Sequence, residues 1–301
     1  MVLGVLAGLG ASFAWALGPL IAEKPARLLG AFELTRIQLI SSFAILLALV
    51  TSTVGWSTIL VQHASAYAVA IVVGVILGNL AMLGCLRRGG AQRTELLFAM
   101  NTPIAAGLGY LVLGETLSAQ QFLGIGLGIA GVMLAISYGK PAGPASGNGP
   151  DFRHMGPLSS VIALGLAAAF CNAIGLIALR PVLTDGAEPL AVTAIRTGGA
   201  ALVMVVVALW PAKAFQSTTQ PTLALTVTAI IPGVLGYVIA VCLQLYALRI
   251  FNTGTAALLG SAAPIMILPM IWIARRQRPR PASWGGAALV VIGAGLTIGA
   301  L

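Results

Sequence analysis

Charged side chains are what this sequence has least of. Only 8% of its 301 residues are Asp, Glu, Lys or Arg, whereas a soluble domain carries about 25%. The 16 basic and 7 acidic side chains are too few to cover a soluble globule of this length. A hydrophobic content of 59% and a mean hydropathy of +1.02 are instead typical of a chain whose surface faces lipid. An ordinary soluble protein is therefore excluded.

Histidine and cysteine are also scarce, with two and three copies. Cys85, Cys171 and Cys242 fall inside apolar runs, which argues against an extracellular disulfide framework. His63 and His154 have no cluster of Cys or carboxylate residues around them with the spacing of a metal site. The sequence also contains no Ser–His–carboxylate set and no phosphate-binding loop. We therefore expect no enzyme, no metal and no other cofactor.

The net charge of +9 raises the question of nucleic acid, and the placement of the charges answers it. The basic residues occupy short gaps between apolar runs, without a stripe of interleaved aromatics, so they indicate membrane topology instead. The chain opens with the apolar segment MVLGVLAGLG and no basic residues ahead of it. We expect no cleaved signal peptide and a retained first helix.

Long apolar runs are what the sequence does contain. A run of about 20 residues crosses a bilayer as a helix, and charge, Pro or Gly separates ten such runs. Between the fifth and sixth lies the only long polar stretch, residues 139–157, whose Gly, Pro and Ser content is typical of a flexible linker. The predicted helices are roughly 2–22, 30–51, 66–86, 92–113, 118–138, 158–179, 190–210, 222–247, 253–274 and 282–301.

The two halves of the chain repeat one another at an offset of about 157 to 161 residues. The segment GLGASFAWALG at 8–18 aligns with GLAAAFCNAIG at 165–175, and Arg36 aligns with Arg196. Small apolar residues match easily by chance, but two Arg pairs and one Pro pair at a nearly constant offset do not. The further pairs are Arg88 with Arg249 and Pro103 with Pro264.

Five helices per repeat is an odd number, so the second repeat enters the membrane from the opposite side. The sequence thus predicts an all-α integral membrane protein with ten transmembrane helices in two five-helix inverted-topology repeats. Residues 1–138 form the first repeat (helices 1–5), 139–157 the linker and 158–301 the second repeat (helices 6–10). Two such halves around a central cavity can rock between two states, which is alternating access.

The basic residues are divided unevenly between the two ends of the predicted helices. Thirteen of the 16 lie on the side that holds the connections after the odd-numbered helices. Arg180, Arg196 and Arg249 lie on the opposite side. The positive-inside rule then places the richer side in the cytoplasm. We expect a multi-pass protein of the cell inner (plasma) membrane with both termini outside the cytoplasm.

Four segments carry a family pattern. They are FAWALGP in the first helix, Arg36 early in the second, LLFAMNTPIAAGLGYLVLGE in the fourth and SAQQFLGIGLGIAGVML in the fifth. Together they resemble the EamA-type branch of the drug/metabolite transporter superfamily. The resemblance implies ten helices in two inverted repeats and a secondary transporter. Exporters of small metabolites such as amino acids are common in that family, and we expect this chain to be one.

The resemblance leaves other membrane functions open. A passive channel would conduct without substrate competition or counterflow, and a lipid-handling membrane protein would need a groove open to the bilayer. For a transporter, the expected partners are a small-molecule substrate and the lipid bilayer, with no nucleic acid. We expect a monomer.

Polar side chains deep in the apolar runs are the candidates for a substrate site. An amide that faces hydrocarbon is costly, so each should face a cavity or a neighbouring helix; plain hydrogen bonding between helices is the alternative. The set is neutral and amphipathic, without a charged clamp, which favours a small zwitterionic or uncharged metabolite over a phosphate ester. The candidates are Trp15, Asn79, Asn101, Thr102, Asn172, Tyr237, Gln244 and Ser261.

Prolines inside the apolar runs are the candidates for hinges. Each removes a backbone donor and frees a carbonyl about one turn earlier, which can bind substrate or permit bending. Pro103 and Pro264 are related by the repeat, so we predict paired hinges there and a further one at Pro19. A static kink is the alternative at each position.

Two carboxylates at or near the membrane are the candidates for proton coupling. Glu33 precedes Arg36 by three residues, so the two can pair on one helix face. Glu95 starts the fourth helix and is the better candidate, since a membrane-embedded carboxylate can carry a proton. An interfacial ion pair is the alternative. Ser118 and Gln121 form a capping-box pattern with a purely structural role.

Overall fold

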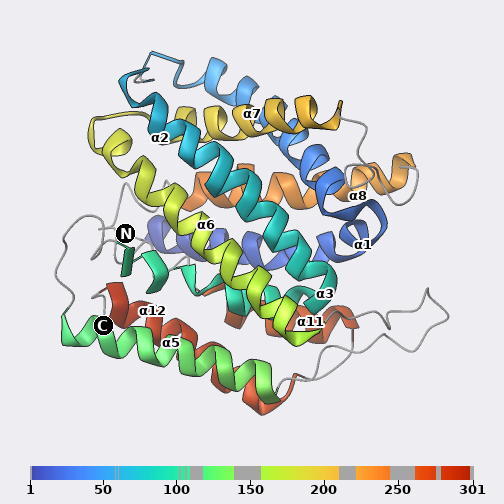
Figure 1. Cartoon of the computed structure of the whole chain (residues 1–301), viewed down its shortest axis with the longest axis vertical. Helices are drawn as coiled ribbons and strands as arrows, with labels where there is room; N and C mark the ends of the chain where they lie inside the picture. The colour runs from blue at the N-terminus through green and yellow to red at the C-terminus, as the bar shows by residue number, and fades with distance from the viewer. Residues whose placement is uncertain are drawn as a thin grey trace.

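Helices make up every regular element of the part of the chain that the structure describes (Figure 1). This computed structural model describes residues 2–57, 59, 61–101, 103–105, 107–108, 118–138, 157–209, 222–244, 262–275 and 279–298. The elements are α1 (Val2–Ser52), η1 (Val61–His63), α2 (Ala64–Val69), η2 (Ala70–Leu77), α3 (Gly78–Phe98), α5 (Ala119–Tyr138), α6 (Leu158–Thr184), α7 (Pro189–Ala208), α8 (Leu223–Gly233), η4 (Val234–Ala240), α11 (Ala263–Arg275) and α12 (Pro281–Ile298).

Two of these helices are each broken by a glycine. In α1 the break is at Gly30, with φ 86° and ψ 165°, and in α3 it is at Gly90, with φ 78° and ψ 170°. Only glycine adopts this backbone region at little cost, so each glycine reverses the chain without a loop. We call 2–29 and 31–52 the first and second limbs of α1.

The first limb is longer than the sequence predicted. Residues 23–29 were expected to connect two helices, yet they remain helical up to Gly30. Glu23 and Arg27 form an ion pair at 3.0 Å across one helical turn. Because each charge satisfies the other, this turn needs no water and continues the helix.

Two segments are π-helical rather than α-helical. One is η2, which joins α2 to α3, and the other is η4, which continues α8. Nothing in the hydrophobic pattern signalled either of them, because a change from i→i+4 to i→i+5 bonding leaves the residues equally apolar. Segments of this kind are frequent at functional sites.

Glycine permits the closest helix contacts. At the crossing of η2 and α6, a Cβ added to Gly74 would lie only 2.9 Å from the Cα of Gly175. Helices α5 and α12 run side by side (Figure 1), and a Cβ added to Gly131 would lie 2.6 Å from the carbonyl oxygen of Gly286. Such close backbone approach is the usual packing of membrane helices.

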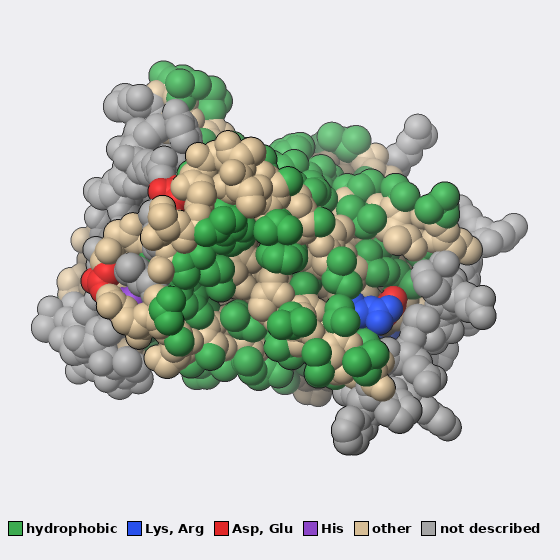
Figure 2. Space-filling view, turned by 90° about the horizontal axis from the view of Figure 1, so that it is seen from above, with side chains coloured by type: hydrophobic (Ala, Val, Ile, Leu, Met, Phe, Trp, Pro, Cys, Tyr) green, Lys and Arg blue, Asp and Glu red, His purple; other side chains and the backbone are tan. Residues whose placement is uncertain are grey.

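The outer surface is that of a multi-pass membrane protein. Among the described residues, five helices are long and apolar enough to cross a bilayer by length and composition, and three shorter apolar helices accompany them. The face in Figure 2 is mostly hydrophobic, and its few charged side chains lie toward the two ends of the view. Parts of the predicted fourth and ninth helices lie outside the described residues, so the count of ten remains a prediction.

Candidate functional site

Four helical elements that pack on one another each carry a polar side chain of interest. The second limb of α1, the junction of η2 with α3, α7 and η4 pack around one hydrophobic cluster. Thr35, Asn79, Arg196 and Tyr237 lie one on each of these elements, and we call them the four-helix polar cluster.

Asn79 joins two of the four elements. Its Nδ2 donates to Thr35 Oγ1 at 3.1 Å. Thr35 is fully buried and donates in turn to the Ala31 carbonyl oxygen at 2.8 Å. The candidate Asn79 is therefore held in place by a bond between helices, while the rest of its amide keeps its capacity for further hydrogen bonds.

Arg196 and Tyr237 come from the other two elements. The guanidinium of Arg196 and the phenol of Tyr237 lie near enough to interact electrostatically. The Nε of Arg196 is enclosed and has no hydrogen-bond partner. None of the ion pairs found among the described residues includes Arg196. Within the described part of the chain, this cation inside the bundle thus lacks the counter-charge that such groups ordinarily have.

The first half of the chain treats its equivalent arginine differently. Arg36 Nη2 donates to Glu33 Oε1 at 2.7 Å, one turn back on the same limb. The predicted pairing of these two side chains is confirmed. In α7 the residue three places before Arg196 is Thr193, an uncharged side chain that donates to the Pro189 carbonyl oxygen at 2.9 Å. One arginine is neutralised locally, and the other is not.

A second polar pair connects α6 with the segment that follows α3. Asn101 Nδ2 donates to Asn172 Oδ1 at 2.9 Å, and both amides are half-buried. The two residues are distant in the sequence but were both among the substrate-site candidates. An amide has two donors and an acceptor oxygen with two lone pairs, so this bridge leaves each partner with unused capacity.

The remaining substrate-site candidates are spread more widely. Trp15 is half-buried against the largest hydrophobic cluster, and Gln244 is half-buried beyond the end of η4. Thr102 and Ser261 lie outside the described residues.

The three proline candidates are all buried. Pro19 lies within the first limb of α1, where its ring deprives the Trp15 carbonyl of its usual helical donor. Pro264 instead lies in the first turn of α11, where a missing N–H costs nothing. Pro103 likewise follows the turn at residues 99–100 closely, so the paired hinges stay a prediction.

Glu95 lies in α3 just beyond the Gly90 break and is 5% exposed. None of the three ion pairs among the described residues involves it. Glu33, the other proton-coupling candidate, is committed to Arg36 at 2.7 Å. Among the described residues, the structure thus distinguishes a carboxylate with an ionic partner from one without.

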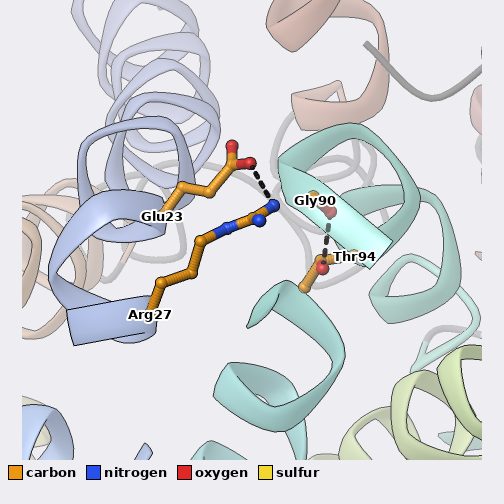
Figure 3. A network of polar contacts seen from close by, with 4 residues as sticks. All are labelled: Glu23, Arg27, Gly90 and Thr94. Carbon is orange, nitrogen blue, oxygen red and sulfur yellow. Dashed lines mark hydrogen bonds and ion pairs between the residues drawn. The ribbon is translucent and has the colours of Figure 1, made fainter. Parts of the chain in front are cut away.

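A further polar network fastens the break in α3 (Figure 3). The Glu23–Arg27 pair of α1 faces Gly90, where an added Cβ would lie 3.7 Å from Glu23 Oε1. Thr94 donates to the Gly90 carbonyl oxygen at 2.9 Å. Glu23, which the sequence assigned to a connection, is in fact only 6% exposed. The first limb of α1 is thus held against the break of α3 at Gly90.

Arg196 is the functional candidate that sequence reasoning missed. It was counted only as one of three charges on the poorer side of the membrane. A signal was nevertheless present in the repeat: the alignment of Arg36 with Arg196 also places Glu33 opposite Thr193. The loss of that carboxylate marks the second arginine as different.

Comparison with known proteins adds a family and a fold. The EamA-like transporter family matches residues 2–137 and 159–299. No curated protein sequence matches the chain. One solved structure, described only as the crystal structure of a protein, superposes with a TM-score of 0.69 at 16% identity, covering 97% of this chain and 95% of that one. At this identity the likeness concerns the fold alone.

Proposed function

The chain belongs to the EamA-like transporter family, and on that premise we propose that it is a secondary transporter that exports small metabolites, with amino acids as the first candidates. The members of this family are transporters rather than enzymes. The apolar helices agree with a protein that crosses the membrane several times. Substrate, direction and mechanism are the proposed parts.

We propose two five-helix repeats of inverted topology, 1–138 and 158–301, joined by a linker at 139–157. One packing relation carries this proposal. Gly18 aligns with Gly175, and the offsets of 160 and 161 on either side of Gly74 place its counterpart at Val234 or Leu235, two or three residues after Pro232. The crossing of Gly74 with Gly175 then has a nearby counterpart, in which a Cβ added to Gly18 would lie 3.8 Å from the Pro232 carbonyl oxygen. An exchange of the two halves brings one crossing to within two or three residues of the other.

The two π-helical segments also support this relation. At offsets of about 158 to 161, η2 corresponds to a stretch that overlaps η4. Each segment adjoins one of the two crossings, since Gly74 lies in η2 and Pro232 directly precedes η4. A π-helical turn has weaker packing of its own backbone than an α-helical turn, so it is a natural place for a helix to bend. We propose that both segments flex when the repeats alternate their access.

The proposed path runs between the halves, past the four-helix polar cluster and the Asn101–Asn172 bridge. These polar groups keep unused hydrogen-bonding capacity in an apolar bundle, as a substrate path requires. The buried prolines are proposed to allow bending along it. The proposed lining residues are Trp15, Asn79, Asn101, Thr102, Asn172, Tyr237, Gln244 and Ser261, and the proposed hinges are Pro19, Pro103 and Pro264.

Counterflow in liposomes tests the function directly. Purified protein is reconstituted with unlabelled amino acid inside, and uptake of the same labelled amino acid is followed from outside. A transporter gives a transient, saturable accumulation that other substrates compete with. Conductance without saturation or competition would identify a channel, and exchange of labelled lipid with no amino-acid flux would identify a lipid-handling protein.

For coupling we propose that Glu95 carries the proton. A buried carboxylate without an ionic partner can be neutral in the membrane and charged at either side, whereas Glu33 is held by Arg36. The test is Glu95→Gln under an imposed pH gradient, with exchange in the absence of a gradient as its control. Loss of gradient-driven uptake with exchange retained supports coupling; unchanged gradient-driven uptake removes Glu95 from the mechanism.

For orientation we propose the inner membrane, with both termini outside the cytoplasm. The two ends of the chain lie toward the same side in Figure 1, in keeping with an even number of crossings. The excess of basic residues on the side of the connections after odd-numbered helices indicates that this side is cytoplasmic. C-terminal fusions to a reporter active only in the cytoplasm and to one active only outside it distinguish the two orientations, and cytoplasmic activity reverses the assignment.

A further inference from the structure

We infer that Arg196 and Tyr237 form a recognition site for a carboxylate group on the transported molecule. This inference deepens the proposed function. That the bound molecule is transported rests on the proposed function, whereas its binding can be measured without transport. It narrows the expected substrate from small zwitterionic or uncharged metabolites to molecules that carry a carboxylate.

The first reason is that the guanidinium has no counter-charge among the described residues. Arg196 Nε is enclosed without a hydrogen-bond partner. Across the described part of the chain, no hydrogen bond or ion pair of the Arg196 side chain is found. The side chain is only half-buried as a whole, so its terminal nitrogens are not sealed off as Nε is. An unpaired cation within a membrane bundle marks a substrate or ion pathway.

The second reason is the chemistry of the neighbours. A guanidinium presents a planar fork of donors that matches a carboxylate through two parallel bonds. Tyr237 adds a hydroxyl that can donate to the same oxygen atoms. A phosphate ester carries up to two negative charges, and the other members of the four-helix polar cluster, Thr35 and Asn79, are neutral. One cation with the neutral hydroxyl of Tyr237 near it fits a group of one negative charge.

The third reason is the internal comparison with the first half. Arg36 occupies the aligned position and is neutralised by Glu33 at 2.7 Å. In α7 that carboxylate is replaced by Thr193, which is 7% exposed and bonded to its own helix backbone. A purely structural arginine would gain from the same local partner, so its absence leaves a place for a carboxylate that comes from outside the chain.

The test measures binding of matched carboxylates and amides to the purified full-length protein in detergent. The probes are L-phenylalanine with L-phenylalaninamide, L-leucine with L-leucinamide, and benzoate with benzamide, followed by isothermal titration calorimetry. We expect at least one carboxylate to bind the wild-type protein about ten- to a hundredfold more tightly than its amide, as for hydrogen bonds to a charged group. Equal affinity within every pair, or no binding of any carboxylate, overturns the inference.

Three variants locate the effect. Arg196→Gln removes the cation, and Thr193→Glu leaves Arg196 in place but supplies the carboxylate that Glu33 supplies in the first half. Both should abolish the preference for carboxylates. Arg36→Gln is the matched control, since its charge is already neutralised, and should keep the preference. A carboxylate preference that survives Arg196→Gln, or that is lost equally in Arg36→Gln, overturns the assignment.

Thr193→Glu also guards against a trivial loss of fold. It should melt at the same temperature as the wild type or higher, because it pairs a buried charge, so lost binding cannot be ascribed to unfolding. Counterflow with the same probes separates the two proposals. Arg196-dependent binding without counterflow retains the site and overturns the transporter. Unchanged carboxylate counterflow by the Arg196→Gln variant overturns the site and retains the transporter.

Discussion

The two halves of this chain place an arginine at the same point of the second helix and surround it differently. Arg36 has Glu33 one turn back, at 2.7 Å, and needs nothing further. Arg196 has Thr193 there, and its Nε has no partner. On the inference drawn above, a single change of residue one helical turn away separates a locally paired arginine from one that a ligand can pair. In a protein built from repeats, such departures from the repeat are the positions at which to look for substrate chemistry.

The largest effect should come from the two helix crossings. A Cβ added to Gly175 would lie 2.8 Å from the Gly74 Cα, whereas one added to its equivalent Gly18 would meet only the Pro232 carbonyl oxygen at 3.8 Å. Backbone cannot yield as a flexible side chain does, so Gly175→Ala should destabilise by about 1–3 kcal/mol. Gly18→Ala should stay within about 0.5 kcal/mol. Thermal unfolding in detergent measures both, and equal losses would mean that the crossings are not distinct.

The comparison of Arg36 with Arg196 can be tested by a substitution in the first half of the chain. Glu33→Gln leaves Arg36 with a weaker, neutral partner and should destabilise the protein. Because Arg36 is about one third exposed, with 35% of its side-chain surface accessible, we expect about 1–2 kcal/mol, less than for a fully buried pair. Thr193→Glu, the opposite change in the second half, should not lower the melting temperature. A Glu33→Gln protein as stable as the wild type would show that Arg36 is neutralised elsewhere.

The Asn101–Asn172 bridge should matter more for transport than for stability. A hydrogen bond between membrane helices contributes about 0.6 kcal/mol, so Asn101→Leu and Asn172→Leu should each melt within a few degrees of the wild type. If the bridge lines the path, both should reduce counterflow severalfold. Asn79→Leu tests the other half of the path in the same assay. If both bridge variants showed wild-type counterflow, the two amides would have only a packing role.

The smallest effect is expected at the end of the bundle. His63 Nε2 and Asp185 Oδ2 lie 2.7 Å apart and connect η1 with the end of α6, and Asp185 is 47% exposed. An exposed pair of this kind contributes about 0–1 kcal/mol. Asp185→Asn should therefore leave the melting temperature and counterflow nearly unchanged. A large loss in either would indicate that this end of the bundle is a working contact between the halves.

Several features of the fold could be predicted because they depend on local pattern. The run predicted at 118–138 appears as Ala119–Tyr138, and its capping box is confirmed, with Ser118 N donating to Gln121 Oε1 at 2.8 Å and Gln121 N to Ser118 Oγ at 3.3 Å. Apolar length and a cap are properties of neighbouring residues, so no tertiary information is needed. The pairing of Glu33 with Arg36 was predictable for the same reason.

Other features of the site could not be predicted. That Asn101 and Asn172 bond to each other depends on which helices cross and at what depth. The helical continuation through 23–29 depends on the Glu23–Arg27 pair lying against Gly90. The polar residues were identified correctly as unusual, but which of them meet is a property of packing.

The amino-acid sequence by itself determined that this chain is a membrane protein and to which family it belongs, because hydropathy, length and repeat are all properties of the chain itself. Only the tertiary structure decided which charges are satisfied. Glu33 reaches Arg36 within one turn, but that Arg196 Nε has no partner among the described residues could be established only from their packing. Whether a charge has a partner depends on the tertiary structure, since any of the other helices could have supplied one.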